Sequence, residues 1–324
     1  MPRTSPAPAA SSRGCSRAAS ALVALALAAS ARAADVAPLD CAKADELTAA
    51  MLPAERAPHV VMPQGSLGIV TMEPFARFLA AMGYPARALV DAHGGAMTTD
   101  SDVSGPTLAG ALAFMHERDG VRPILIGHSK GGGVVIQTLR ALAGADGDEL
   151  PLVDPRTLEP LPRTTYADPS TGERRRVVDL RLPLASAIAT GRMPRVLRGQ
   201  FELARVLRDV PDSVEAFVGF FIPYDPIAGT FAGDEDPYRA LGRAEVRNVV
   251  LPAQTSHIGA PRAEHLAADP AARAWIERYR PGAGAPPPAL RESENLAMAA
   301  ELWYAIKRAW CDESKRAAPA RPGG

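Results

Sequence analysis

The sequence predicts an α/β fold in which a mostly parallel central sheet is flanked by helices. Short apolar runs bounded by glycine and proline alternate along the chain with longer segments of helical periodicity, and this alternation is typical of βαβ units. Parallel sheets of this kind are covered by helices on both faces, so their strands are apolar almost throughout. With 324 residues, 47% of them hydrophobic, the chain can form one large domain or two small ones.

The predicted elements follow one another regularly at first. Strands are expected at 59–62, 87–92, 121–126, 214–222 and 246–251, and helices at 42–51, 74–82, 108–118, 131–142, 193–207, 270–279 and 292–311. The alternation breaks after residue 150, where Asp-Pro pairs followed by threonine and glycine favour one or two β-hairpins up to about 184. The helix at 193–207 is rich in arginine, which fits either a solvated helix face or an anion-binding lid.

Both ends of the chain are predicted to lie outside the folded domain. Three arginines precede an apolar run at 18–29, and Ala-Arg-Ala at 31–33 provides the small residues that a signal peptidase recognises. This pattern predicts a signal peptide at 1–33 and export to the periplasm or the medium, with an amphipathic N-terminal helix as the alternative. A disordered tail is predicted at 313–324, which leaves 34–312 as the folded domain.

The bulk composition excludes several classes of partner. The 36 basic and 36 acidic residues balance to a net charge of zero, which argues against binding of nucleic acid through bulk charge. After the signal peptide no segment of the sequence is long and apolar enough to be a transmembrane helix. No spacing of cysteine and histidine suggests zinc, so no metal is expected.

Cysteine usage agrees with export. Without the signal peptide the chain retains Cys41 and Cys311, which lie near its two ends. In an oxidising compartment they can form a disulfide, and the chain-entropy model gives a stabilisation of roughly 5 kcal/mol for so long a loop. Two free, buried thiols are the alternative.

The segment Gly127-His128-Ser129-Lys130-Gly131 is the most informative part of the sequence. It is a G-x-S-x-G pentapeptide between a predicted strand and a predicted helix, which is the context of a nucleophile elbow. The two glycines permit a turn in which a Cβ would collide, and the turn raises the Ser129 hydroxyl to the carboxyl end of the sheet. An ordinary glycine-rich turn between strand and helix is the alternative.

A nucleophilic serine needs a base, which accepts its proton, and an acid that orients the base. In an elbow of this type both follow the serine in the chain, the acid first and the histidine last. His257 comes just after the last predicted strand, in a position to reach the top of the sheet, and is the candidate base; a structural histidine is the alternative. His265 falls within a predicted helix and is expected at the surface.

The acid is expected between the serine and the base. Asp225 follows the strongest strand of that interval and is the candidate, with a turn-forming aspartate before proline as the alternative. Asp234 and Asp236 are rivals in a more polar loop, whereas Asp212 fits a turn or a cap.

Two backbone N–H groups are expected to stabilise an oxyanion. One belongs to Lys130, at the N-terminus of the helix that follows the elbow, where the helix dipole favours negative charge. The second is expected in the loop at 63–68, where the N–H of Ser66 is the best candidate and that of Leu67 the next. A simple glycine turn is the alternative for this loop.

Taken together, these residues resemble the α/β-hydrolase superfamily, and within it the lipases and esterases. The resemblance rests on 127–131, Gln64-Gly65, Asp225-Pro226-Ile227 and Ser256-His257-Ile258-Gly259, and it spans about residues 59–280. Lipases usually carry His-Gly where this chain has Gln64-Gly65. The resemblance implies an α/β-hydrolase fold with a cap of hairpins and a helix inserted at about 150–210.

It further implies an exported serine hydrolase that acts on carboxylic esters of small molecules or lipids without a cofactor. A thioesterase, a peptidase or a polyester depolymerase would carry the same three side chains, so these activities stay open. Two further alternatives are a non-catalytic exported binding protein on a hydrolase scaffold, and a surface module whose arginines bind anionic lipid or polymer.

Overall fold

The structure is a computed structural model that describes residues 39–66, 70–197, 199–230, 236–283, 286–290 and 294–317. The predicted signal peptide at 1–33 lies outside the described residues, as does the predicted tail from residue 318 onward.

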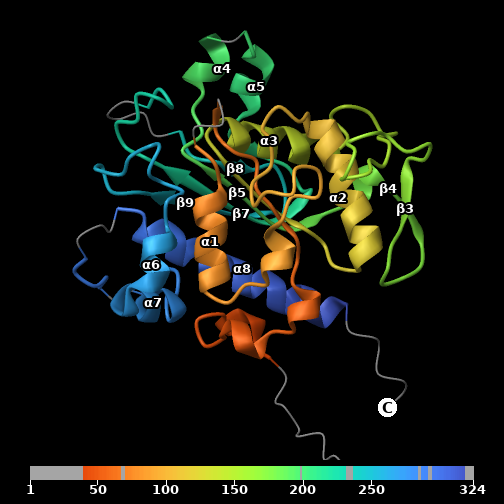
Figure 1. Ribbon diagram of the computed structural model, residues 1–324. Helices are drawn as coiled ribbons and strands as arrows, with labels where there is room; N and C mark the ends of the chain where they lie inside the picture. The colour runs from red at the N-terminus through yellow and green to blue at the C-terminus, as the bar shows by residue number, and fades with distance from the viewer. Residues whose placement is uncertain are drawn as a thin grey trace, which may run out of the picture. The chain divides into compact units, whose positions relative to one another are not determined.

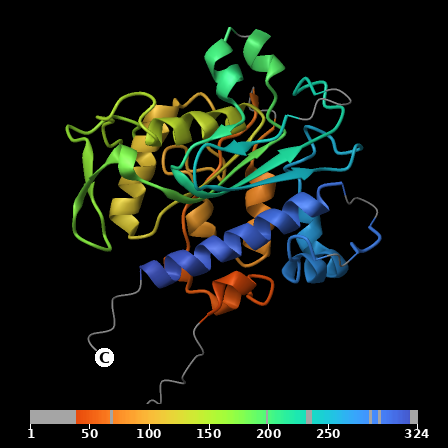
Figure 2. The ribbon, with the colours of Figure 1, turned by 180° about the vertical axis from the view of Figure 1, so that it is seen from behind.

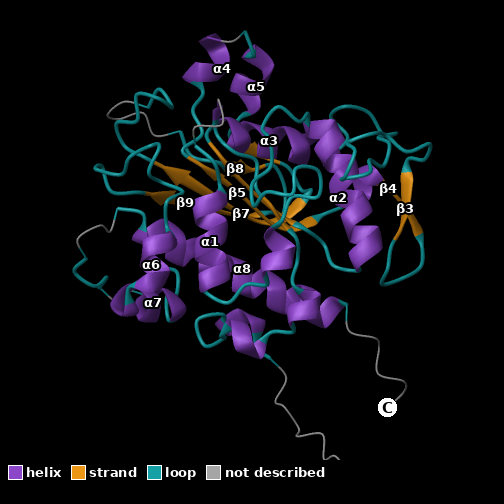
Figure 3. Ribbon diagram, in the orientation of Figure 1, coloured by secondary structure: helices purple, strands orange, loops and turns teal. Residues whose placement is uncertain are grey.

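A parallel sheet of five strands forms the centre of the described chain (Figures 1 and 3). All neighbours in it are parallel, in the order β1 (Val60–Val61), β2 (Ile124–His128), β5 (Leu182–Ile188), β7 (Val214–Phe221) and β9 (Glu245–Val250). Every residue of β2 and β5 is buried, as expected for parallel strands covered on both faces. The predicted α/β architecture with a central parallel sheet is therefore confirmed.

Helices cover both faces of the sheet (Figures 1 and 2). One group comprises α1 (Glu73–Ala81), α6 (Glu264–Ala268), α7 (Pro270–Glu277) and α8 (Leu296–Arg316), and the other comprises α2 (Gly105–Asp119) and α3 (Lys130–Leu142). Successive side chains of β2 alternate between them, because Ile124 and Ile126 pack with the first group and Leu125 packs with the second. Within the described ranges, no helix has both the length and the apolarity to cross a membrane.

The prediction of a single cap inserted at 150–210 is wrong, because this interval contains β5, the middle strand of the sheet. Separate pieces lie on either side of β5. An antiparallel hairpin of β3 (Thr165–Ala167) and β4 (Arg174–Arg176) precedes it, which confirms a hairpin there, and the short helices α4 (Met193–Leu197) and α5 (Phe201–Val206) follow it. Figure 1 shows the hairpin beyond α2 and the two helices above the sheet. Beyond them, β6 (Asp209–Val210) pairs with β8 (Arg239–Ala240).

Two predicted elements take a different form. The prediction of a strand at 87–92 is wrong, because a 3₁₀-helix occupies Ala86–Leu89. Its consecutive residues Ala88 and Leu89 are both buried whereas Val90 is exposed, a pattern that suits a helical turn and not a strand. In place of the helix expected at 42–51 the chain forms 3₁₀-helices at Cys41–Lys43, Ala49–Met51 and Ala54–Arg56. A further one, Val177–Asp179, precedes β5.

The helix α8 holds the N-terminal segment of the described chain. Cys41 forms the predicted disulfide with Cys311 of α8, with their Cα atoms 5.5 Å apart. The fully buried Lys307 donates hydrogen bonds from Nζ to the carbonyl oxygens of Leu47 at 2.8 Å and Glu277 at 2.9 Å. A buried ammonium group is tolerated only with such partners, so these contacts fix the segment after Cys41 against α8.

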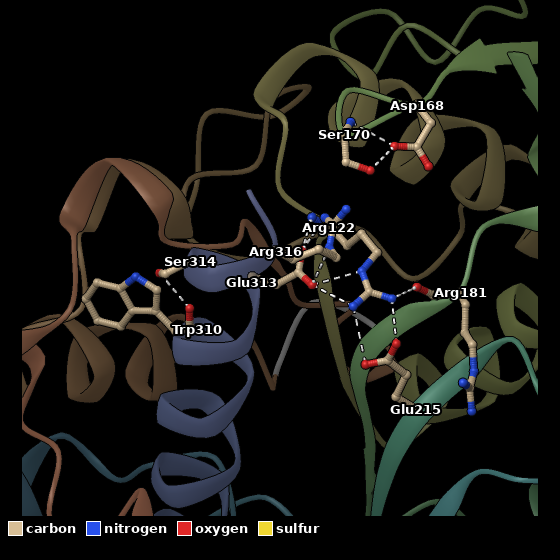
Figure 4. Close-up of polar contacts among 9 residues, drawn as sticks. All are labelled: Arg122, Asp168, Ser170, Arg181, Glu215, Trp310, Glu313, Ser314 and Arg316. Carbon is tan, nitrogen blue, oxygen red and sulfur yellow. Dashed lines mark hydrogen bonds and ion pairs between the residues drawn. The ribbon is translucent and has the colours of Figure 1, made fainter. Parts of the chain in front are cut away.

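The prediction of a disordered tail from Glu313 is wrong for its first four residues, because α8 continues to Arg316. Glu313 is fully buried and accepts hydrogen bonds from Arg122 and Arg316, each at 2.6 Å (Figure 4). Arg122 also binds Glu215 at 2.7 Å. Because Arg122 precedes β2 and Glu215 is the second residue of β7, this network ties the end of α8 to the amino ends of two strands of the sheet.

Candidate active site

Ser129 lies in the turn between β2 and α3 with φ 53° and ψ −112°. A positive φ is uncommon for a residue with a Cβ and is found where the surrounding structure holds it. Here the Ser129 N–H donates to the carbonyl oxygen of Ile188, at the end of β5, at 2.8 Å. A Cβ on Gly127 would lie 2.4 Å from the carbonyl carbon of Gly131. The predicted sharp turn is therefore present, and it requires glycine at 127.

His257 meets the Ser129 hydroxyl from a loop between β9 and α6. Its Nε2 lies 3.0 Å from Ser129 Oγ. The imidazole is buried, whereas Ser129 is only half-buried. This places a nitrogen base within hydrogen-bond reach of the Ser129 hydroxyl.

Asp225 lies behind His257, in the loop after β7. Its Oδ2 is 2.6 Å from His257 Nδ1, and it is almost completely buried. The other carboxylate oxygen accepts hydrogen bonds from the backbone N–H groups of Ile227 at 3.1 Å and Ala228 at 3.0 Å. These donors fix the carboxylate so that Oδ2 faces the imidazole. Asp225 thus orients His257 with its proton on Nδ1, which leaves Nε2 as the acceptor for Ser129.

The rival residues are engaged elsewhere or lie outside the described chain. Asp236 binds the guanidinium groups of Arg208 and Arg192, each at 3.2 Å, and Asp212 forms an ion pair with Arg243. Asp234 is not among the described residues. His265 lies in α6 and is half-buried. Of the candidate acids and bases, the structure brings Asp225 and His257 together with Ser129.

The loop after β1 packs directly against the elbow. A Cβ on Gly131 would come within 2.0 Å of the Pro63 carbonyl oxygen, so the absence of a side chain permits this contact. Lys130 is the first residue of α3, and its N–H therefore has no acceptor within the helix. Ser66 is half-buried in the same loop as Pro63, whereas Leu67 lies outside the described residues.

The side chain of Lys130 forms an ion pair with Asp102 and is therefore engaged outside the turn. Only its backbone N–H is left to act at the end of β2. Within the described ranges, no group of three or more histidine, cysteine, aspartate or glutamate side chains is arranged to hold a metal ion.

Two further side chains at this site were not identified from the sequence. His128 is fully buried, and its Nε2 lies 2.9 Å from the backbone carbonyl oxygen of His257. Arg195 of α4 places Nη2 3.5 Å from the Ser129 carbonyl oxygen and is 5% exposed, so at this position the arginine-rich segment is not a solvated face. Both contacts join residues far apart in the chain, and no local sequence pattern encodes them.

The geometry is that of a hydroxyl, an imidazole and a carboxylate joined in one line by hydrogen bonds. In this arrangement a proton can pass from the Ser129 hydroxyl to His257 while Asp225 stabilises the resulting imidazolium. Comparison with known proteins adds nothing to this geometry, since no protein-family model and no curated protein matches the sequence.

Proposed function

We propose that this protein is an exported serine hydrolase that cleaves carboxylic esters through an acyl-enzyme. The observation that carries the proposal is the pair of contacts at His257: 3.0 Å from Nε2 to Ser129 Oγ and 2.6 Å from Nδ1 to Asp225 Oδ2. A serine hydroxyl at neutral pH is a weak nucleophile, and this arrangement supplies both the base and the group that orients it.

In the first half of the reaction, Ser129 Oγ attacks the carbonyl carbon of the ester while His257 Nε2 takes the hydroxyl proton. The carbonyl oxygen becomes an oxyanion, to which the N–H groups of Lys130 and Ser66 donate hydrogen bonds. Asp225 stabilises the imidazolium of His257. When the tetrahedral intermediate collapses, His257 returns the proton to the departing alkoxide, and the alcohol leaves.

In the second half, water replaces the alcohol. His257 Nε2 takes a proton from the water, whose oxygen attacks the acyl carbon bound to Ser129. The proton then passes to Ser129 Oγ as the carboxylic acid is released. The resting hydrogen bonds are restored, so the cycle consumes only ester and water.

The disulfide supports the exported part of the proposal, because such bonds persist in oxidising compartments. The choice of a carboxylic ester of a small molecule or a lipid as the substrate rests on the resemblance to lipases and esterases. A thioesterase, peptidase or polyester depolymerase would use the same three side chains. A binding protein without activity has no need of a strained Ser129 at hydrogen-bond distance from His257, which weighs against that alternative.

The test is labelling of the mature protein with a fluorophosphonate, which reacts with activated serines. We expect the wild type to be labelled and labelling to be lost in Ser129→Ala and His257→Ala. Ser186→Ala is a matched control, because it removes a buried serine hydroxyl that donates to the Val218 carbonyl oxygen in the sheet. A folded wild-type protein that resists labelling, or a Ser129→Ala variant that is labelled equally, would overturn the proposal. Chromogenic esters, thioesters and amides then identify the preferred bond.

A further inference from the structure

The mechanism proposed above leaves one buried titratable side chain next to the nucleophile without a role. His128 is the last residue of β2 and is fully buried. Its backbone N–H donates to the Pro63 carbonyl oxygen at 3.2 Å, in the loop that also contains Ser66. Its side chain reaches the loop that carries His257. His128 therefore contacts two of the loops that meet at Ser129.

The hydrogen bond to His257 fixes which nitrogen of His128 carries the proton. Nε2 of His128 lies 2.9 Å from the backbone carbonyl oxygen of His257. A carbonyl oxygen can only accept, so Nε2 must carry the proton and donate it. In the neutral ring Nδ1 is then an acceptor, and it is buried without a hydrogen-bond partner among the described residues. It faces Gly65, where a Cβ would lie 3.2 Å away.

The ring of His128 stays neutral beside a base that becomes charged. Burial is the main cause, and the neighbouring His257 adds to it; together they lower the pKa of His128 to about 3. The two ring centroids are 4.9 Å apart with 58° between their planes. A neutral ring at this distance can pack against the His257 imidazole without repelling its protonated form. A lysine or arginine at 128 would oppose that protonation.

His257 has few other backbone anchors, because it belongs to neither a helix nor a strand. On the side toward β9, the Thr255 hydroxyl donates to the Glu294 carbonyl oxygen at 2.9 Å. On the side toward α6, the Asn295 amide donates to the Arg262 carbonyl oxygen at 2.7 Å. At His257 itself, the main-chain hydrogen bond found among the described residues is the one from His128. The residue beside the nucleophile thus holds the main chain of the base.

We propose that His128 is a positioning residue that sets the place of the His257 imidazole by donating a hydrogen bond to its main-chain carbonyl and packing against its ring. This inference rests on the proposed function, since it takes His257 to be the base for Ser129. His128 itself does not touch the reacting atoms. Its contribution is to keep Nε2 of His257 at the 3.0 Å separation from Ser129 Oγ.

Two substitutions separate the hydrogen bond from the volume of the ring. His128→Phe keeps a ring but removes the donor, whereas His128→Gln keeps an N–H donor with a similar reach. Misplacement of a catalytic group by about 1 Å can lower a rate about 100-fold. We expect His128→Phe to lower kcat for a chromogenic ester by about this factor with little change in KM, and His128→Gln to recover most of it. Ser186→Ala, which loses a comparable buried hydrogen bond, should keep the wild-type kcat.

A second measurement does not depend on activity. Nitrogen NMR of the histidine rings should show His128 with its proton on Nε2. The ring of His257 should give one sharp set of signals in the wild type and in His128→Gln, and signals broadened or displaced in His128→Phe. The positioning role is overturned if His128→Phe matches Ser186→Ala both in kcat and in the signals of His257. If the wild type resists the fluorophosphonate but these signals still respond to His128→Phe, the hydrolase proposal fails and the positioning of His257 stands.

Discussion

Substitution of Gly131 by alanine tests how the loop after β1 is held against the elbow. The new Cβ would lie 2.0 Å from the Pro63 carbonyl oxygen, 2.4 Å from the Pro63 carbonyl carbon and 2.7 Å from the Gln64 carbonyl oxygen. All three atoms belong to the backbone, so no side chain can swing away to make room. To reach even 3.0 Å, the separation below which real Cβ contacts essentially never occur, the Pro63 carbonyl must retreat by about 1 Å.

A retreat of this size has two separate consequences, one for the reaction rate and one for stability. A shift of about 1 Å at a catalytic group costs about 100-fold in rate, and Ser66 is three residues from Pro63 in the same loop. Overpacking of a well-filled site costs about 1–3 kcal/mol in the free energy of unfolding. For a domain of this size that is a decrease of roughly 2–5 °C in melting temperature. We therefore expect Gly131→Ala to fold and to react about 100-fold more slowly with a fluorophosphonate.

The assay follows labelling against time together with thermal unfolding. Gly94→Ala is the control, because a Cβ there has ordinary contacts only, with Asp91 Oδ1 nearest at 3.7 Å. It should label and unfold like the wild type. A Gly131→Ala protein that is less stable but labels at the wild-type rate would show that the loop does not serve the reaction. Wild-type values in both measurements would refute the packing of Pro63 on the elbow.

Asp225→Asn keeps an oxygen that can accept from the N–H groups of its own loop, but it weakens the orientation of the His257 ring. We therefore expect kcat in an ester assay to fall by about 10,000-fold. An unchanged kcat would mean that another group orients His257. Cys41→Ser removes the disulfide, and chemical denaturation should show a free energy of unfolding lower by about 2–5 kcal/mol. Equal free energies of unfolding for the variant and the wild type would contradict the idea that the disulfide stabilises the fold. Burial of Glu313 opposes its ionisation, but hydrogen bonds from Arg316 and Arg122 outweigh burial and lower its pKa below the usual 4.5. A lowered pKa in the folded state adds stability above the usual pKa, and this stability is lost as the pH falls through the folded-state pKa. Glu313→Gln should therefore be less stable than the wild type in thermal unfolding at pH 7, and the difference in stability between the two proteins should shrink below about pH 4.5. A difference that does not change with pH would refute a stabilising role for the Glu313 charge.

The sequence carries most of the candidate site because each part of it has a local signature. The elbow at 127–131 needs glycine at fixed positions, and the polar residues Asp225 and His257 each follow a predicted strand. Side chains that follow parallel strands meet at one edge of the sheet, so the order of elements alone brings these residues together. The rival Asp236 is engaged by the almost fully buried Arg208, a tertiary pairing that no local sequence pattern encodes.

The errors have physical causes. Leu182–Ile188 contains a proline and a serine and follows a proline-rich segment, so it does not resemble a central strand; in the fold the Ser186 hydroxyl is satisfied by the Val218 carbonyl oxygen. Glu313 has the appearance of a charged tail residue, and its burial depends on Arg122, which is 191 positions away in the chain. Contacts of this kind, like that of His128 with His257, belong to the tertiary structure and have no trace in local sequence.

The disulfide between Cys41 and Cys311 also has a consequence for the time order of folding. The bond joins nearly the first described residue to nearly the last, across a separation of 270 positions. A chain that emerges from a ribosome or a membrane channel with its N-terminus first holds Cys41 unpaired until α8 has followed. The segment after Cys41 accepts a hydrogen bond from Lys307 of the same helix. This contact, too, can form only after α8 has emerged. The disulfide can therefore lock the fold only after α8 has emerged, and until then Cys41 lacks the partner that it has in the folded protein.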